Sequence, residues 1–290
     1  MLVKEAMHAR SLTAEPHMTL PEAVVKMQEL RVKRLPVVHD GKVVGLLTDG
    51  EIRRNLPALS EGLTPWEFVG RAARVRVRDA MRQPVHTVTP DSPLEQAIQT
   101  MLERRIGGMP VVDDSGQLVG MLTLTDVLRA EQHAPRLQWG SAEQHMTAQV
   151  VTAQPQDDLA DAAKRLQESR LRVLPVVEGG QLVGLLHETA VTDAQEKALA
   201  VRGQAASDQA ATTEAVLRGR QVSELMKLPT GYVQEGSPMR DVLQVMIELD
   251  VHGLPVVDME GQLLGVVTIS DVLRGLLGQG QPSAQHPGYS

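Results

Sequence analysis

A hydroxyl side chain followed three residues later by a carboxylate occurs at two equivalent places in the chain, as Thr123 with Asp126 and as Thr268 with Asp271. In both places the Thr ends a short apolar run, and a helical pattern begins directly after it. The first turn of a helix has unpaired N–H groups and the positive end of the helix dipole, so a hydroxyl there can help to hold a phosphate. A nearby carboxylate can accept two hydrogen bonds from a vicinal diol. The two pairs therefore fit a ribose phosphate.

The same residue types also have a purely structural use. Thr, Ser and Asp at the start of a helix are favoured as caps, and taken alone capping is the more common role. Two further places weigh against that interpretation, because Thr48 is followed by Glu51 and His187 by Ala190. The repeat around His187 keeps the rest of its pattern, so the fold does not require the pair. We therefore predict two complete sites at the Thr–Asp pairs, an incomplete third site at Thr48 and Glu51, and none at His187.

A fourfold internal repeat positions these residues. In each copy an opening Met is followed 29 residues later by a Pro within Leu/Met-Pro-Val-Val, and after 9 or 10 more residues by a Gly. Four identical offsets indicate duplication. The sets are Met7, Pro36 and Gly45; Met81, Pro110 and Gly120; Met146, Pro175 and Gly184; and Met226, Pro255 and Gly265.

Each copy is predicted to run strand, helix, strand, strand, helix. Apolar residues recur at helical spacing over 94–102, and two short Val/Leu runs separated by an Asp/Gly turn follow, as in a β-hairpin. Ser92 is the predicted N-cap of that helix, with Pro93 in its first turn, and Thr19 with Glu22 predicts a capping box in the first copy. The fold class is therefore α+β.

The repeats are predicted to work in pairs, because a unit of about 50 residues with one apolar helix face and a small sheet cannot cover its own hydrophobic surface. The linkers between the copies suggest which repeats pair. We expect repeats at 1–54, 77–130, 143–192 and 221–277, paired into modules 1–130 and 143–277, and a disordered tail at 278–290.

Together the Met-led start, Leu-Pro-Val-Val and the Gly-apolar-apolar-Thr-x-x-Asp ending resemble the cystathionine-β-synthase (CBS) domain, here in four copies forming two Bateman modules with pseudo-twofold symmetry. The linker from Leu56 to Glu67 is also similar to that of acetoin-utilisation-type CBS proteins. The resemblance implies that Thr123 and Thr268 meet the phosphate of an adenosine ligand, and that Asp126 and Asp271 bind its ribose hydroxyls.

The resemblance also places the adenine between the first strand of a repeat and the residues around its Pro. An apolar slot with backbone N–H and C=O groups can read a purine edge, although core packing explains each Val or Met singly. The implied residues are Thr87, Met109, Pro110 and Val111 in repeat 2, and Tyr232, Leu254, Pro255 and Val256 in repeat 4.

Basic side chains just before Leu-Pro are the candidates for phosphate binding. They are Lys33 and Arg34 in repeat 1, Arg172 in repeat 3 and His252 in repeat 4. In a pseudo-twofold pair the repeat-1 residues can serve the repeat-2 ligand, where 107–108 is Gly-Gly and leaves room. A solvated charge is the equally frequent alternative for each.

The composition argues against several other functions. Net charge is -7, and two Trp, two Tyr and one Phe offer few base-stacking surfaces, so we expect no nucleic-acid partner. There is no Cys, no apolar run long enough for a membrane span and no signal peptide, which predicts a cytoplasmic protein without membrane contact. No HExxH, P-loop or G-x-S-x-G motif occurs, so no catalytic residue and no metal site is predicted.

The sequence therefore predicts a regulatory protein, not an enzyme, that binds an adenine nucleotide, with or without Mg²⁺, in clefts between its repeats. Ligand occupancy would be passed to a target protein by population shift. We expect a homodimer, although the two modules of one chain could also stack on each other. The alternative function is a CBS scaffold whose clefts are empty and which binds other proteins.

Overall fold

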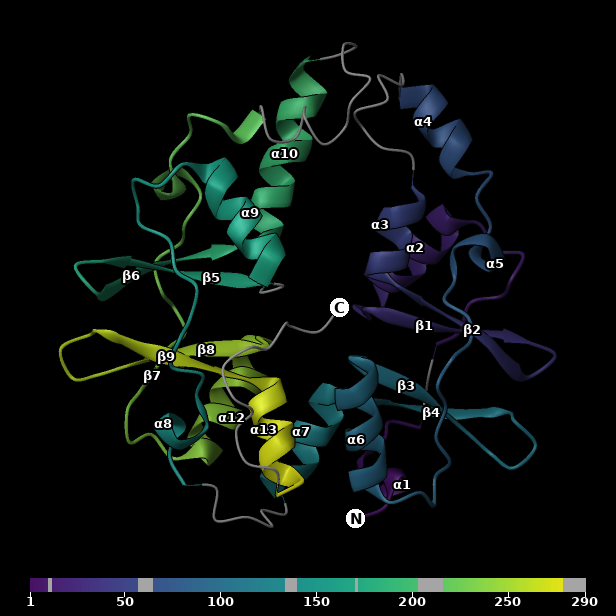
Figure 1. Ribbon diagram of the computed structural model, residues 1–290. Helices are drawn as coiled ribbons and strands as arrows, with labels where there is room; N and C mark the ends of the chain where they lie inside the picture. Colours follow the sequence, from purple (N-terminus) through teal and green to yellow (C-terminus); the bar gives the residue numbers. More distant parts are fainter. Residues whose placement is uncertain (10–11, 57–64, 134–139, 170–171, 203–215, 279–290) are drawn as a thin grey trace. The chain divides into compact units, whose positions relative to one another are not determined.

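The computed structural model describes residues 1–9, 12–56, 65–133, 140–169, 172–202 and 216–278. These residues form two compact units, one over 1–127 with repeats 1 and 2, and one from Leu128 onward with repeats 3 and 4 (Figure 1). The linker residues 57–64 and residues 279–290 of the predicted tail lie outside the described residues.

Repeat 2 shows how the sequence pattern becomes structure. Helix α6 (Leu94–Arg104) buries Leu94, Ala97, Ile98 and Met101, which are the apolar positions at helical spacing. Strands β3 (Gly108–Val112) and β4 (Leu118–Thr123) form an antiparallel hairpin. A short helix, α5 (Val77–Ala80), precedes the repeat, and the closing helix α7 (Leu124–His133) begins directly after β4.

The other repeats have the same order of elements, so the α+β class and the fourfold repeat predicted from the sequence are confirmed. Repeat 1 contains α1 (Val3–Ala6), α2 (Leu20–Glu29), β1 (Arg34–His39), β2 (Lys42–Thr48) and α3 (Asp49–Asn55), and α4 (Pro65–Ala72) follows in the linker. Repeat 3 contains α8 (Ala142–His145), α9 (Leu159–Ser169), β5 (Val173–Glu178), β6 (Gln181–His187) and α10 (Glu188–Arg202). Repeat 4 contains η2 (Val222–Glu224), β7 (Val233–Gln234), α12 (Met239–Leu249), β8 (Gly253–Val257), β9 (Leu263–Thr268) and α13 (Ile269–Leu276).

The first strand of each repeat is shorter than predicted. Among the described residues only repeat 4 has a strand there, β7, which pairs in parallel with β8. In the other repeats one residue makes a parallel bridge, and in repeat 2 Val88 N–H donates to the Pro110 carbonyl at 3.1 Å while Val112 N–H donates to the Val88 carbonyl at 2.9 Å. The chain then turns at 89–92 into α6, which leaves no length for a longer strand.

The two repeats of a unit exchange their leading segments. Helix α1 of repeat 1 packs against α6 of repeat 2, and α5 of repeat 2 packs against α2 of repeat 1 (Figure 1). The first N–H of each long helix donates to a carbonyl of the sister repeat's leading segment. The pairs are Leu94 to Met1 at 2.9 Å, Leu20 to Val75 at 3.0 Å, Leu159 to Arg220 at 2.8 Å and Met239 to Gly140 at 3.1 Å.

This exchange corrects one predicted cap. The N-cap of α6 is Pro93, not Ser92, because the orphan Leu94 N–H already has a backbone partner from the other repeat. The Ser92 hydroxyl instead lies 2.8 Å from the Thr89 hydroxyl. In α2 the predicted capping box of Thr19 and Glu22 is present.

The exchange also explains why an opening Met and a hairpin Gly recur together. Each Met packs on the Gly of the sister repeat, as Met81 does on Gly45. A Cβ at Gly120 would lie 2.7 Å from the His8 carbonyl oxygen and 3.2 Å from the Met7 sulfur. Any side chain at these glycines would therefore push the sister segment away.

Candidate functional site

The predicted Thr–Asp pair of repeat 2 is assembled where β4 ends and α7 begins. Both the backbone N–H and the hydroxyl of Thr123 donate to Oδ2 of Asp126, at 2.8 and 2.5 Å. The Asp126 N–H in turn donates to the Thr123 hydroxyl at 3.3 Å. The pair thus forms the reciprocal capping arrangement that was the structural alternative. Capping and ligand binding by the same carboxylate are compatible, since a carboxylate has about four acceptor positions.

A third group on Asp126 comes from repeat 1. Nδ1 of His8, the residue after the opening Met7, lies 3.0 Å from Oδ2 of Asp126. Burial raises the pKa of Asp126, but the hydrogen bonds from His8 and Thr123 outweigh it, and the pKa lies below its ordinary value. Asp126 is therefore held as a carboxylate, the form that accepts hydrogen bonds from a sugar diol.

The pair in repeat 4 has the same local geometry and a different charge partner. The Thr268 N–H and hydroxyl donate to Oδ2 of Asp271 at 2.8 and 2.7 Å. Nη2 of Arg274, one turn further along α13, donates to Oδ1 at 2.7 Å, and the Asp271 side chain is only 5% exposed. In repeat 4 an ion pair within the same helix therefore holds the carboxylate.

The incomplete pair of repeat 1 is also involved in ion pairs. The Thr48 hydroxyl donates to Oε2 of Glu51, while Arg54 and Arg82 donate to Oε1 at 2.6 and 3.2 Å. Arg82 follows the opening Met81, as His8 follows Met7. In Glu51 both carboxylate oxygens thus already accept hydrogen bonds from cationic or hydroxyl side chains.

In repeat 3 the corresponding place is basic. Burial lowers the pKa of His187, and the positive charge of Lys227 lowers it further. Lys227 again follows an opening Met, Met226. Together with Ala190 at the carboxylate position, this leaves repeat 3 without the acceptors that a ribose requires.

A cavity of about 180 Å³ lies beside the first strand segment of repeat 2. Its lining, taken from the described residues, includes Thr87 and Met109 from the predicted adenine set but neither Thr123 nor Asp126. The remaining lining residues were not predicted. They are Val88, Thr89, Ser92, Gln96, Ala97 and Thr100.

The predicted adenine residues separate into a buried and an exposed group. Thr87 is exposed, and Tyr232 is 48% exposed. The residues around each Pro belong to the core, in agreement with the packing alternative, and their backbone groups form the hairpins. The buried residues are Met109, Pro110 and Val111 in β3, and Leu254, Pro255 and Val256 in β8.

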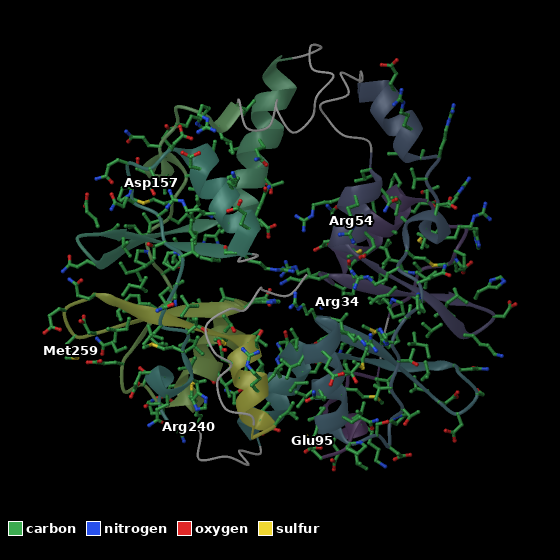
Figure 2. All side chains as sticks on the ribbon, viewed as in Figure 1. Arg34, Arg54, Glu95, Asp157, Arg240 and Met259 are labelled. Carbon is green, nitrogen blue, oxygen red and sulfur yellow. The ribbon has the colours of Figure 1, made fainter. Side chains whose placement is uncertain are left out.

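Arg34, labelled in Figure 2, reaches from repeat 1 to repeat 2. Its guanidinium lies against Gly107, where a side chain would clash with it. The glycine therefore provides space for an arginine from the sister repeat, as the sequence suggested. Lys33 and Arg172 are exposed and His252 is partly buried. The carbonyls of Arg172 and His252 accept the first N–H of the following helix at 2.8 and 2.9 Å.

The site residues that were not predicted from the sequence fall into two groups. Gln96 and Thr100 stand one turn apart on the polar side of α6, and only the structure shows that this side borders a cavity. His8, Arg82 and Lys227 each follow an opening Met. Their common offset was visible, but their targets in the sister repeat became apparent only from the exchanged segments.

The described residues contain no group of three or more His, Cys, Asp or Glu that could hold a metal ion, and the absence of a metal site stays a prediction. None of the helices in the described part of the chain has the length and apolar content needed to cross a bilayer.

The fold and the site define a chain of paired CBS repeats, and comparison with known proteins agrees. The model of the CBS domain matches residues 3–58, 77–133, 142–197 and 222–278, so the chain belongs to the CBS domain family. The uncharacterized protein MJ1225 of Methanocaldococcus jannaschii is 30% identical over 280 residues, which cover 94% of this chain and 98% of the relative.

Two solved structures cover nearly the whole chain. The crystal structure of MJ1225, which has been proposed as an archaeal homolog of g-AMPK, gives a TM-score of 0.70 at 27% identity and covers 95% of this chain and 100% of that one. An uncharacterized conserved protein from Pyrococcus horikoshii gives 0.65 at 24% identity, with 95% and 100% covered, which shows a shared fold.

Some matched proteins are enzymes over the rest of their length. Inosine-5'-monophosphate dehydrogenase of Thermoplasma acidophilum is 33% identical over 138 residues, but these cover only 26% of the enzyme and 47% of this chain. CBS repeats thus occur both in enzymes and in relatives without a described activity, and the non-enzymatic nature of this chain stays a prediction.

Proposed function

We propose that this protein is a regulatory CBS protein that binds an adenosine nucleotide in module 1 at repeat 2 and in module 2 at repeat 4, and that signals occupancy to a target protein. Repeat 2 carries the main support. There a cavity whose lining residues carry no charge, an ionised Asp126 and an arginine from the sister repeat occur in one module. These features suit a base, a ribose diol and a phosphate, respectively.

Family membership supports the same proposal, because MJ1225, which matches along nearly its whole length, has been proposed as a homolog of g-AMPK. The output would be a population shift between two packings of the paired repeats. Ligand at 100 times its dissociation constant stabilises the bound form by about 2.7 kcal/mol. A homodimer, or stacking of the two modules, would provide the surface for a target protein.

Ligand binding and mutation test the site assignment. Thermal shift with AMP, ATP, NAD and S-adenosylmethionine, with and without Mg²⁺, should identify a stabilising ligand, and titration calorimetry should then count its sites. We expect Asp126→Ala and Asp271→Ala each to remove one site or weaken it at least about tenfold, because a ribose diol loses two hydrogen bonds to a charged acceptor. Ala190→Asp is the matched control, and it should add no site because His187 supplies no hydroxyl. Unchanged stoichiometry and affinity in both Asp variants would contradict the assignment.

The capping geometry favours one alternative, a scaffold whose clefts stay empty. In both complete pairs the Thr already donates to the Asp. If none of the four ligands raises the melting temperature, the Thr–Asp pairs are caps only, and protein binding becomes the function to test.

A further inference from the structure

Repeats 2 and 3 can be aligned residue by residue at their first strand segment. The parallel bridges Val88 to Val111 and Ala153 to Val176 are both offset by 65 residues, as are the helix starts Leu94 and Leu159. The turn that follows is also the same, since Ser92 N–H donates to the Thr89 carbonyl at 3.1 Å and Asp157 N–H to the Gln154 carbonyl at 3.1 Å. The alignment pairs Thr87 with Thr152, Ser92 with Asp157 and Thr100 with Arg165.

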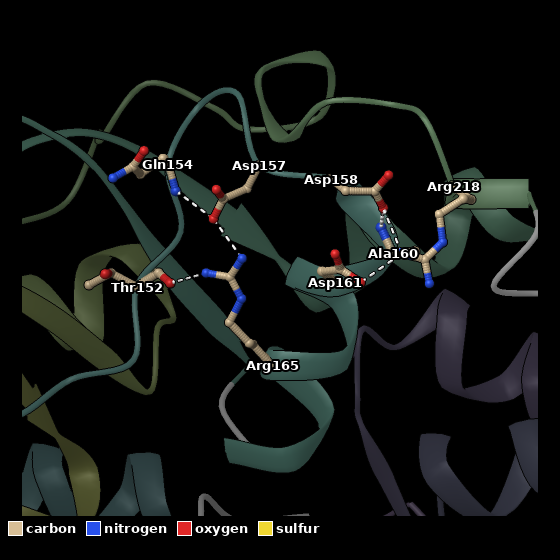
Figure 3. A network of polar contacts seen from close by, with 8 residues as sticks. All are labelled: Thr152, Gln154, Asp157, Asp158, Ala160, Asp161, Arg165 and Arg218. Carbon is tan, nitrogen blue, oxygen red and sulfur yellow. Dashed lines mark hydrogen bonds and ion pairs between the residues drawn. The ribbon is translucent and has the colours of Figure 1, made fainter.

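In repeat 3 the aligned residues form a closed network (Figure 3). Nη1 of Arg165 donates to the Thr152 carbonyl at 2.8 Å, and Nη2 donates to Oδ2 of Asp157 at 2.6 Å. Gln154 N–H donates to the same carboxylate oxygen at 3.1 Å. The planar guanidinium of Arg165 therefore lies between the first strand segment and α9, and both of its Nη groups donate hydrogen bonds there.

In repeat 2 the aligned residues line the cavity instead. Thr87, Ser92 and Thr100 are all lining residues, and the short Thr100 side chain donates to the Gln96 carbonyl of its own helix at 3.0 Å. The side chains that line the cavity carry no formal charge. The cavity therefore offers no charged side chain to a phosphate, and its mixed hydroxyl, amide and apolar lining suits a small uncharged polar group.

We propose that the Arg165 guanidinium is a built-in occupant of repeat 3, and that the repeat-2 cavity, left open by Thr100, binds the amino edge of a 6-aminopurine in the equivalent place. The Thr87 carbonyl accepts from the exocyclic amine, as the Thr152 carbonyl accepts from Arg165. This assignment rests on the proposed function for the identity of the ligand. The residue that decides whether the place is open is Thr100 in repeat 2 and Arg165 in repeat 3.

The position of Thr100 and Arg165 carries a different residue in every repeat, which agrees with a role in selecting the repeat that binds the base. Lys26 occupies it in repeat 1 and Val245 in repeat 4. In repeat 4 Val242 also replaces Ala97, and Tyr232 replaces Thr87. The side chains around this position are therefore bulkier in repeat 4, and a base there meets a different surface.

Transfer of the repeat-3 network into repeat 2 tests the proposal. In the full chain carrying Asp271→Ala, in which the repeat-4 site is removed or weakened and repeat 2 dominates binding, titration calorimetry compares AMP with IMP, whose purine has a 6-oxo group. We expect AMP to bind at least about tenfold more tightly, because the oxo group would face the Thr87 carbonyl. Ser92→Asp with Thr100→Arg should abolish AMP binding, and Lys26→Arg at the aligned position of repeat 1 should leave it unchanged. Equal affinity for AMP and IMP, or AMP binding by the double variant as in its parent, would overturn the proposal.

A second experiment does not depend on nucleotide binding or on the folding of that variant. Arg165→Ala should lower the melting temperature of the full chain, and millimolar methylguanidine should restore part of the loss, whereas methylammonium should not. If the parent binds neither AMP nor IMP, the proposed function fails, and this rescue still decides whether the place recognises a planar N–H donor. Equal effects of the two cations would refute that recognition.

Discussion

Repeats 2 and 3 share a backbone and differ in what their side chains place beside the first strand segment. In repeat 2 hydroxyls surround a cavity, whereas in repeat 3 Arg165 and Asp157 fill the same place with an ion pair. At the other end of the site, repeat 2 has the ionised Asp126, and repeat 3 has His187 beside Lys227. The same backbone thus surrounds a cavity in repeat 2 and a network of its own side chains in repeat 3.

Repeat 3 shows that the place beside the first strand segment can be filled by the protein's own side chains. A buried cavity costs packing energy, and an unpaired buried donor or acceptor costs about 1–3 kcal/mol. Repeat 3 satisfies both demands with one arginine. Substitutions at three places test how far repeats 2 and 3 differ in stability.

The largest effect is expected at the hairpin glycines. Gly120→Ala would place a Cβ 2.7 Å from the His8 carbonyl oxygen, and backbone cannot move without disturbing the exchanged segment. Gly184→Ala meets the flexible Met226 sulfur at 2.8 Å, with the nearest carbonyl at 3.3 Å. We expect a loss of about 2–3 kcal/mol of unfolding free energy for Gly120→Ala and roughly half of that for Gly184→Ala, measured by urea denaturation.

Gly70→Ala is the control for this pair, because nothing lies within 4 Å of its added Cβ, and a helical Ala should be neutral or stabilising. Equal losses at Gly120 and Gly184 would show that the backbone contact is no harder to displace than the Met side chain.

A smaller effect is expected from the network in repeat 3. Burial raises the pKa of Asp157, but the Gln154 N–H and Arg165 outweigh it, so the pKa is lowered and the group is a carboxylate. Asp157→Asn should cost about 1–2 kcal/mol, because Arg165 loses a charged partner in a partly buried place. Ser92→Ala, the matched change in repeat 2, should cost less than about 0.5 kcal/mol. Similar losses in both variants would mean that the ion pair adds no more than the hydroxyl.

The smallest effect is a difference in pH dependence. The pKa of His187 in the folded chain lies below its ordinary value of 6.5, so the unfolded chain takes up a proton first as the pH falls. The free energy of unfolding therefore decreases as the pH falls below about 6.5. Well above that pH His187 is neutral in both states and causes no such loss. The lowered pKa of Asp126 has its effect much lower, because its stabilisation is present above the ordinary value of 3.8 and is lost on further acidification.

Thermal melting between pH 7.5 and 5.5 should thus detect His187. In His187→Gln the slope of the melting temperature against pH should decrease over this range, because the group with the lowered pKa has been removed. A slope unaffected by His187→Gln would contradict the lowered pKa.

Much of the fold followed from the sequence because its signals are local. The α6 stripe around Leu94 and Ile98 and the hairpin turns depend on near neighbours, and they form as predicted. The N-cap at Ser92 was wrong because its competitor, the Met1 carbonyl, comes from the other repeat. The Thr–Asp pairs were found from their spacing, but His8 and the cavity depend on contacts across the module, which spacing alone does not encode.

Because the leading segments are exchanged, the sequence repeat is not the same as the folding unit, which is the pair of repeats. A fragment cut at the sequence boundaries of repeat 2 would lack the Met1 carbonyl that receives Leu94 N–H and would keep α5, which packs against α2 of repeat 1. Gain or loss of copies during evolution is therefore expected to proceed two at a time, since a lone copy would have neither a complete surface nor a place for its own beginning.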